Sequence, residues 1–403
     1  MYRRILVAAR TDCAVRLIRA CHDEGAQAFL VSSRDDDHGV AHEHADGVVF
    51  TGMSREAYTA EDDILEAARR TNCEAILPGW GFLSEEYAFA RRCRFMGIHF
   101  IGPKSNHIQI FGDKLKTIQT LCGTLPDSVL PCRDGDFRTR LDKTRGPWML
   151  KGRFGGGGKN IERFDDRALL EARLEVLAAS GALSRYYVEP AVDDASHIEF
   201  QVFGDGRGRV EIVGARDCSP QRHHQKWLET SLDLGDLPPN LCDSMEQMRN
   251  RLAQLGYFGW GTVEFLVSSQ GQVHLLELNP RLQVEHGVTE MMTGIDLVRT
   301  AIRLSCGGNF EFCRTLPVAS QAVEYRLFAE KTGTIRTIGF AGHPWPSAPD
   351  AGVCWRIESG YRSGDRVTGV YDGLVARFMV GTNAKNAHET LKKWLSTFVF
   401  EMV

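Results

Sequence analysis

Apolar and polar residues follow one another along the first hundred positions in the order that is typical of a doubly wound sheet. Short apolar runs at 5–9, 26–33, 75–78 and 99–101 predict strands, and amphipathic stretches at 13–24, 61–71 and 85–96 predict helices. This alternation predicts an open α/β domain. The motif G-x-G-x-x-G is absent after the first strand, where Ala9-Arg10-Thr11-Asp12 stands, so the pattern disfavours a dinucleotide site.

The pattern changes after Lys114. A helix, a strand that ends at Lys151 and a helix over 165–179 surround the glycine run 155–158, and this arrangement predicts a lid-like α+β unit. Residues 197–285 predict antiparallel strands, interrupted by a polar loop at 217–226 and a helix at 242–255. From residue 318 onward the pattern predicts short strands and a helix that begins near Ala387.

Composition narrows the class of protein. The 403-residue chain has 43% hydrophobic and 25% charged residues, which indicates a folded protein of two or three subdomains. Its formal net charge of −4 gives no basic surplus, so we expect no nucleic-acid binding. No apolar run is long enough to span a membrane and the first residues suit a strand better than a signal peptide, so we expect a cytoplasmic protein without a membrane anchor.

The first candidate site is a hairpin. Two predicted strands, 262–267 and 273–279, are joined by a turn around Gly271. If this turn centres the pairing, Glu264 lies directly opposite Glu277. Facing carboxylates repel each other unless a cation lies between them, and oxygen-only ligands favour Mg²⁺ or Mn²⁺ over zinc. Two solvated glutamates on an exposed hairpin give the same pattern, so the pair alone leaves both interpretations open.

The continuation of this hairpin is polar at every second position. In an extended chain this period places alternate side chains on one face. Here they are Glu277, Asn279, Arg281, Gln283 and Glu285. A solvated edge strand can show the same alternation, but it ordinarily includes Lys, Thr and Ser. Five groups in series that can bind a metal or an anion favour a functional site.

The glycine run between Lys151 and Lys159 offers consecutive backbone N–H groups that can close over phosphate oxygens. It is not a Walker A loop, because Arg153 takes the first glycine position and Asn160 stands where Ser or Thr binds Mg²⁺. If ATP is bound, another fold must hold it.

Several motifs, in this order along the chain, together resemble the biotin carboxylase family of ATP-grasp enzymes. They are Pro78-Gly79-Trp80-Gly81-Phe82-Leu83-Ser84-Glu85, Phe100-Ile101-Gly102-Pro103, Gly112-Asp113-Lys114, the glycine run, His197-Ile198-Glu199, Arg216-Asp217-Cys218-Ser219 and the segment 277–285. The resemblance implies an ATP-grasp fold, with an N-terminal Rossmann-like open sheet and a C-terminal mixed α/β domain. The implied domains are 1–112, the ATP-grasp domain with its glycine-rich lid at 113–317, and a truncated C-terminal domain at 318–403.

The resemblance also implies the roles of individual residues. Nucleotide and active-site contacts are expected from Lys114, Lys151, Gly155, Gly156, Gly157, Gly158, Glu189, His197, Gln221 and His224. Metal ligands are expected at Glu264, Glu277 and Asn279, where the hairpin already suggested a cation. The bicarbonate pocket is expected to comprise Lys226, Arg281, Gln283 and the backbone of Val284. Glu285 is the expected general base, and Arg356 is expected to stabilise the enolate-like oxygen of biotin.

The implied reaction uses ATP with Mg²⁺ or Mn²⁺ to activate bicarbonate as carboxyphosphate, from which biotin is carboxylated. No Met-Lys pair is present, so biotin is expected on a separate carrier protein. A carboxyltransferase component and a homodimer are further expected partners. Pro190 after Glu189 and the short loop at Lys331-Thr332 depart from the family and bear on nucleotide affinity. Two alternatives stay open, namely an ATP-grasp ligase that activates bicarbonate or another carboxylate without biotin, and a non-catalytic nucleotide-binding relative.

Overall fold

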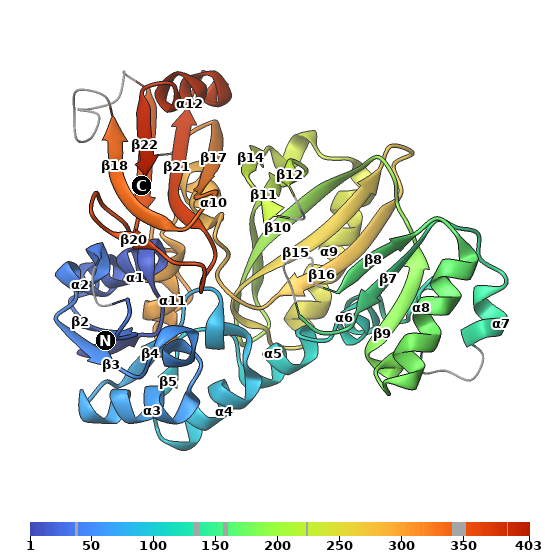
Figure 1. Ribbon diagram of the computed structural model, residues 1–403, viewed down its shortest axis with the longest axis horizontal. Coiled ribbons are helices and arrows are strands. Elements are labelled where there is room, and N and C mark those ends of the chain that lie inside the picture. Colours follow the sequence, from blue (N-terminus) through green and yellow to red (C-terminus); the bar gives the residue numbers. More distant parts are fainter. Residues whose placement is uncertain are drawn as a thin grey trace.

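A computed structural model describes residues 1–36, 39–132, 137–155, 160–222, 225–316, 318–340, 352–384 and 386–403, with the backbone alone at Arg222 and Gln225. An α/β unit at the N-terminus and a lid-like unit lie at opposite ends of the molecule, and a large antiparallel sheet lies between them (Figure 1). Within these residues, no helix has the length and apolar character needed to cross a membrane.

The N-terminal sheet is parallel, with the strand order β3-β2-β1-β4-β5. Its elements are β1 (Arg4–Val7), α1 (Thr11–Asp23), β2 (Gln27–Ser32), α2 (Val40–His44), β3 (Gly47–Phe50), α3 (Glu61–Arg70), β4 (Ala75–Leu77), α4 (Tyr87–Phe95) and β5 (His99–Phe100). Ile5 and Val7 belong to one hydrophobic core and Leu6 belongs to another, because alternate residues of β1 point to opposite faces of the sheet. The predicted open α/β domain is confirmed.

The central sheet has eight strands in the order β16-β15-β10-β11-β14-β17-β21-β19, and its pairings are antiparallel. The strands are β10 (Ala195–Asp205), β11 (Val210–Asp217), β14 (Leu228–Leu232), β15 (Phe258–Ser268), β16 (Val273–Asn279), β17 (Gln321–Phe328), β19 (Val353–Ser359) and β21 (Leu374–Thr382). Helix α9 (Pro239–Gln254) packs on one face, where Met245 and Leu252 share a core with Phe200 and Val263. Alternate residues therefore leave the polar side chains of β10 and β15 on the opposite face.

The strands from the last part of the chain extend this same sheet, because β17 pairs with β14. Strands from both sides of the expected boundary at residue 317 thus belong to one continuous sheet. A further small sheet, ordered β20-β18-β22, comprises β18 (Gly333–Phe340), β20 (Arg366–Val367) and β22 (Phe398–Met402). Helix α12 (Ala387–Leu395) packs on β17 and β21 of the large sheet, with Leu391 in one core with Val323 and Phe378.

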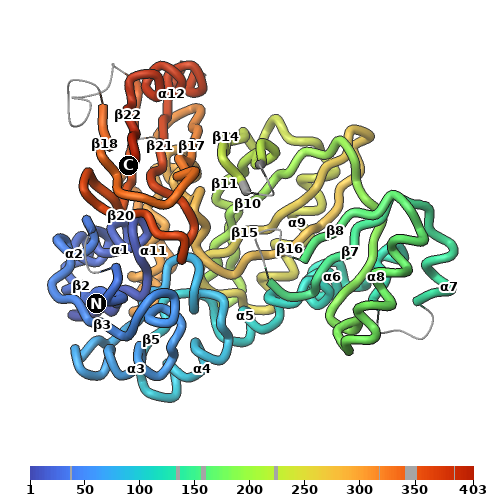
Figure 2. Tube along the Cα trace, viewed as in Figure 1, coloured from blue at the N-terminus to red at the C-terminus, as the bar shows by residue number. Residues whose placement is uncertain are grey.

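The lid-like unit is a four-stranded sheet with one helical side. Its strands are β6 (Leu130–Pro131), β7 (Trp148–Gly152), β8 (Ile161–Phe164) and β9 (Tyr186–Pro190), and its helices are α7 (Phe137–Leu141) and α8 (Arg167–Ala179). Leu150, Leu174 and Val188 form its separate core. Helices α5 (Ser105–Phe111) and α6 (Lys114–Cys122) connect it to the N-terminal unit, as the trace in Figure 2 shows. The predicted α+β lid is confirmed.

Candidate active site

The polar face of the eight-stranded sheet carries a row of charged side chains on adjacent strands. Glu277 of β16 lies opposite Glu264 of β15, so the pairing predicted from the sequence is confirmed. Glu264 in turn lies opposite Glu199 of β10. Glu199 lies opposite Arg216 of β11, and both of these side chains are fully buried. Three carboxylates in a row repel one another, so the open side of the row requires further cations.

A cavity of about 500 Å³ opens over this row, which is the size of a small-molecule site. It lies against lid strands β7 and β8, the hairpin of β15 and β16, and strand β17. Predicted site residues in its lining are Lys114, Lys151, Gly155, His197, Gln221, Lys226, Glu264, Glu277, Asn279, Arg281, Gln283, Val284 and Glu285. The fold therefore gathers residues that are far apart in the sequence around one space.

Glu285 is held between two cations in this cavity. One carboxylate oxygen accepts from Lys226 Nζ at 2.8 Å, and the other accepts from Arg326 Nη2 at 2.8 Å. Burial opposes ionisation, but Lys226 and Arg326 outweigh it and lower the pKa of Glu285 well below its ordinary value. Glu285 is thus ionised at neutral pH, and its basicity rises when another anion draws these cations away.

Lys226 contacts three carboxylates at once. Its Nζ lies 2.6 Å from Glu199, 2.8 Å from Glu285 and 3.3 Å from Glu264. Burial disfavours the charged ammonium, but the carboxylates outweigh it and raise the pKa of Lys226 well above its ordinary value. A permanent positive charge therefore stands beside the carboxylate of Glu285.

The carboxylates of Glu264 and Glu277 converge on one atom. Both accept a hydrogen bond from Nδ2 of Asn279, at 2.8 and 3.1 Å respectively. A divalent ion at this position would have two carboxylates and, once the amide is turned over, the Asn279 oxygen as ligands. Such an oxygen-only set fits Mg²⁺ or Mn²⁺. The predicted metal set is thus geometrically suited to the ion.

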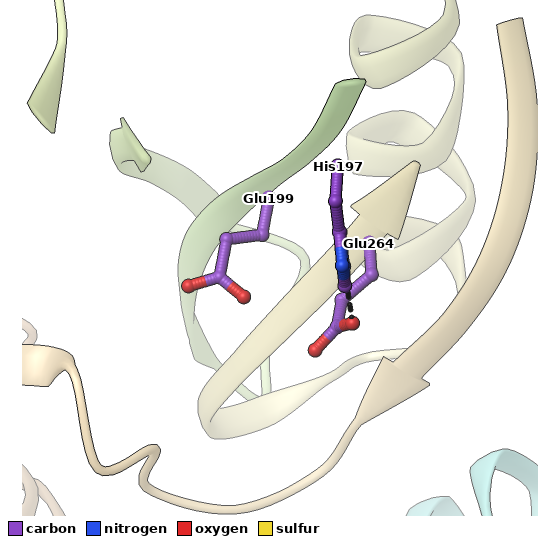
Figure 3. Close-up of side chains that lie close together, drawn as sticks. All are labelled: His197, Glu199 and Glu264. Atoms are coloured by element: carbon purple, nitrogen blue, oxygen red, sulfur yellow. Dashed lines mark hydrogen bonds and ion pairs between the residues drawn. The ribbon is translucent and has the colours of Figure 1, made fainter. Parts of the chain in front are cut away.

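His197 and Glu199 form a second group of ligand atoms around Glu264 (Figure 3), and one ligand atom from each of the three lies within 4.8 Å of the others. His197 Nε2 lies 2.7 Å from Glu264. Burial lowers the pKa of His197, but Glu264 outweighs it and raises the pKa above its ordinary value. Glu199 already contacts Arg216 at 2.5 Å. A protonated imidazole and a neutralised carboxylate are poor ligands, so this group suits a metal less well than Glu264, Glu277 and Asn279.

Lysines stand where phosphate groups are expected. Lys114 is the first residue of α6, and its Nζ donates to the Gly155 carbonyl at 2.6 Å and contacts Glu277 at 2.8 Å. A helix N-terminus next to a glycine loop is a favourable place for a phosphate. Lys151, at the end of β7, pairs with Glu189 at 2.5 Å. Gly156, Gly157, Gly158 and His224 lie outside the described residues.

The polar loop at 217–226 is more regular than predicted, because it contains the short paired strands β12 (Gln221–Arg222) and β13 (Gln225–Lys226). Gln221 uses its Nε2 to donate to His197 Nδ1 at 2.8 Å and to the Cys218 carbonyl at 3.0 Å. This small hairpin orients the His197 ring and places Lys226 over the row of carboxylates.

The prediction of one extended run over residues 277–285 is wrong beyond Asn279. Strand β16 ends there, Pro280 has no N–H to continue the ladder, and Glu285 is the N-cap of α10 (His286–Thr293). The polar side chains reach the same cavity from a turn instead.

Two residues of this turn are tied to distant parts of the chain. Gln283 Nε2 donates to Glu264 at 2.8 Å. Arg281 Nε donates at 3.1 Å to Glu85, which belongs to the N-terminal unit. The turn is therefore held from both sides, with Val284 at the cavity wall.

Arg356, the predicted catalytic arginine, does not line the cavity. It donates to Glu290 at 2.7 Å and contacts Glu358 of its own strand at 3.2 Å. Besides the predicted Arg281, the cavity wall contains Arg326 of β17, which sequence reasoning missed. The alternation of Glu324 and Arg326 places both on one face of a strand, but only the pairing of β17 with β14 brings that face to Glu285.

Comparison with known proteins agrees with this geometry. Residues 1–108 match the family model "Biotin carboxylase, N-terminal domain", and residues 113–312 match "Carbamoyl-phosphate synthase L chain, ATP binding domain". A pyruvate carboxylase component of Methanothermobacter thermautotrophicus is 32% identical over an alignment of 416 positions, gaps included. The alignment covers 99% of this chain and 84% of that protein. The chain belongs to the biotin carboxylase family.

A solved structure and a further relative are also similar to this chain over nearly all of its length. The crystal structure of the biotin carboxylase domain dimer of Hydrogenobacter thermophilus 2-oxoglutarate carboxylase, in complex with MgADP, ADP and bicarbonate, matches with a TM-score of 0.87 and 30% identity, over 100% of this chain and 91% of that one. The mitochondrial methylcrotonoyl-CoA carboxylase alpha chain of Arabidopsis thaliana is 35% identical over 98% of this chain. The chain spans 56% of that protein, about half its length. The predicted ATP-grasp fold is confirmed by these biotin carboxylase neighbours.

Proposed function

We propose that this chain catalyses the ATP- and bicarbonate-dependent carboxylation of biotin through carboxyphosphate. The observation that carries the proposal is the carboxylate of Glu285, which is ionised between Lys226 and Arg326 at the wall of a cavity that also holds the acidic hairpin. Base, anion-binding groups and metal ligands therefore meet in one space, as the activation of a one-carbon acid requires.

Bicarbonate would bind beside Glu285, held by Lys226, Arg281, Gln283 and the backbone of Val284. As the bound anion draws the ammonium of Lys226 toward itself, the pKa of Glu285 rises and the carboxylate accepts the bicarbonate proton. The deprotonated oxygen then attacks the γ-phosphorus in line, and ADP leaves. The carbon-bound oxygen is thereby joined to phosphorus in a mixed anhydride, which makes the carboxyl group transferable.

The nucleotide would lie toward the lid. Lys114 at the start of α6 and Lys151 on β7 would face the triphosphate, and Glu189 would hold the adenine. Their present partners, Glu277 and Glu189, keep both lysines in place before the nucleotide enters. The closure of glycines 155–158 over the triphosphate stays a prediction. Mg²⁺ or Mn²⁺ at Glu264, Glu277 and Asn279 would offset the charge of the phosphates. His197, Gln221 and His224 complete the expected nucleotide contacts.

Biotin would enter from the side of β17. Carboxyphosphate would break to release phosphate, which would accept the proton of the ureido nitrogen, and that nitrogen would form the new bond to the carboxyl carbon. The ureido oxygen gains negative charge as the nitrogen loses its proton, and a fixed cation stabilises such an oxygen. Arg356 is the cation expected for this role, and Arg326 supplies a further positive charge in the cavity wall. The neighbouring Phe328 and Leu374 give the same wall an apolar part.

The partners and surroundings of the chain are part of the proposal. A carrier protein that presents biotin, a carboxyltransferase component and a homodimer are expected, and the named relatives are components of carboxylases. The domain limits of 1–112, 113–317 and 318–403 and the cytoplasmic location stay predictions.

The test is the initial rate of ATP hydrolysis by the purified chain, measured with and without bicarbonate and free biotin. We expect hydrolysis to need bicarbonate and Mg²⁺ and to be accelerated by biotin. Bicarbonate-dependent hydrolysis that biotin leaves unchanged would point to another ATP-grasp ligase. MgATP binding without any hydrolysis would point to a non-catalytic relative.

A further inference from the structure

The turn that carries the proposed bicarbonate contacts is held from behind by a buried arginine. Arg377 of β21 is fully buried, and its Nη1 donates to the carbonyl oxygen of Val284. Its other nitrogens are also paired, because Nε donates to Asp12 of α1 at 2.7 Å and Nη2 donates to Glu358 of β19. One guanidinium therefore joins the turn to the N-terminal unit and to the edge strand of the large sheet.

A second buried donor meets the same turn. His286, the first residue of α10, is fully buried, and its Nδ1 lies 2.8 Å from the carbonyl oxygen of Gln283 and 3.1 Å from that of Val284. Burial lowers the pKa of His286 to about 4, although Glu290 opposes this shift, so the imidazole is neutral at neutral pH. Because carbonyl oxygens only accept hydrogen bonds, Nδ1 carries the proton and donates it to them. Both carbonyls thus point toward the buried side of the turn.

Peptide geometry then fixes the direction of the N–H group between these two carbonyls. The peptide that joins Gln283 to Val284 is trans, so its C=O and N–H point in opposite directions. His286 holds the C=O on the buried side, and Val284 lines the cavity on the other. Among the described residues, none accepts a hydrogen bond from the Val284 N–H. This N–H is therefore available to an anion in the cavity.

An aromatic ring of the N-terminal unit supports both donors. The ring centroid of Trp80 lies 4.9 Å from Cζ of Arg377, which is the geometry of a cation–π contact, and 5.6 Å from the ring centroid of His286. Trp80 itself packs against the core that contains Ile5 and Val7 of β1. The N-terminal sheet thus backs the two donors and, through them, the turn.

We propose that Arg377 and His286 are positioning residues, which hold the two carbonyls from behind and so aim the Val284 N–H at bicarbonate. This inference rests on the proposed function. Neither residue lines the cavity, so both act through the turn alone. Their loss should therefore weaken the use of bicarbonate before it affects MgATP, whose expected contacts lie on the lid and on the hairpin of β15 and β16.

The test removes the His286 donor with and without a replacement. His286→Leu has a similar volume but no donor, whereas the amide in His286→Asn can donate from nearly the same place. Neither variant changes the charge at neutral pH, so the ion pairs of Arg377 stay intact. For His286→Leu we expect KM for bicarbonate, from initial rates of ATP hydrolysis, to rise about 10- to 100-fold, the cost of misplacing a substrate-binding group. KM for MgATP should stay within about twofold, and His286→Asn should restore most of the loss.

Arginine variants test the other donor against a matched control. Arg377→Met removes the guanidinium, and Arg377→Lys keeps a positive charge without the fork of donors. The control is Arg299→Lys, because Arg299 of α11 (Leu297–Ser305) also ties a later segment to α1, through Glu24 at 2.6 Å, but does not contact the turn. We expect all three variants to lower Tm. KM for bicarbonate should rise most in Arg377→Met, less in Arg377→Lys and not in the control.

The kinetic results separate positioning from a merely structural role. A KM for bicarbonate within about twofold of the unmodified value in His286→Leu would overturn the proposal. Equal rises of KM for bicarbonate and for MgATP would overturn it as well. Where Arg377→Met does not fold, the two His286 variants decide, since they leave every ion pair in place.

Hydrogen exchange keeps this inference distinct from the proposed function. The exchange rate of the turn over residues 280–285 is measured by mass spectrometry without any substrate. It should be faster in His286→Leu and Arg377→Lys than in the unmodified chain, and unchanged in Arg299→Lys. If hydrolysis proves independent of bicarbonate, the proposed function fails, and these rates still decide whether the two residues hold the turn. Unchanged exchange in His286→Leu would overturn the proposal.

Discussion

Replacement of Glu285 by glutamine removes the proposed base and keeps its shape. Proton transfer by a positioned side chain contributes about 10²- to 10⁴-fold to a rate. At about 1.4 kcal/mol for each tenfold change, the activation barrier should rise by about 3 to 6 kcal/mol. We expect the rate of bicarbonate-dependent ATP cleavage by Glu285→Gln to fall about 10²- to 10⁴-fold.

The free energy of unfolding of Glu285→Gln should fall by less than the activation barrier of ATP cleavage rises. Breaking a buried ion pair costs about 3 to 5 kcal/mol when it leaves a charge without a partner. In Glu285→Gln neither cation loses all its partners, because Lys226 keeps Glu199 at 2.6 Å and Arg326 keeps Glu229 at 2.5 Å. We therefore expect a loss of stability below about 3 kcal/mol.

The assay combines initial rates of ATP hydrolysis with calorimetric binding of MgATP and denaturant unfolding, for the unmodified chain, Glu285→Gln and the control Glu290→Gln. MgATP affinity should stay within about tenfold in Glu285→Gln, since Glu285 is not among the groups facing the triphosphate. Turnover of Glu285→Gln within about tenfold of the unmodified rate would refute its role as the base. A loss of MgATP binding as large as the loss of rate would also refute it.

Three further predictions follow from particular contacts. Arg356→Lys should lower biotin-dependent turnover about 10- to 100-fold, as steady-state kinetics with free biotin will show, and an unchanged rate would contradict the expected role of Arg356. Glu277→Gln should raise the Mg²⁺ concentration needed for half-maximal hydrolysis at least about tenfold, and an unchanged Mg²⁺ titration would count against the hairpin site. Burial opposes ionisation of Glu358, but Arg377 and Arg356 outweigh it and lower its pKa to about 2, so its ion pairs stabilise the fold at neutral pH and are lost as the pH falls from about 4.5 towards 2. Glu358→Gln should therefore narrow the difference in Tm between neutral pH and about pH 3, and a difference of unchanged size would contradict this account.

The amino-acid sequence alone predicted the N-terminal strands and helices and the hairpin that carries Glu264 and Glu277. Periods of hydrophobicity located the N-terminal strands and helices, because burial against both faces of a parallel sheet leaves a strong apolar signal. The facing of Glu264 and Glu277 also followed from the sequence, since a turn at Gly271 sets the register of two adjacent strands. Local pattern and local geometry are sufficient for such features.

Only the tertiary structure decided that Arg326 lines the cavity while Arg356 does not, and that the extended run ends at Asn279. Arg326 and Arg356 have similar strand contexts, and the order β14-β17-β21-β19 alone places the first beside Glu285 and the second two strands further away. The segment after Asn279 turns because Pro280 interrupts the ladder and α10 begins at once, yet its polar residues still meet Glu85 and Glu264. The order of distant strands depends on the packing of the whole chain, and no periodicity within one strand contains that information.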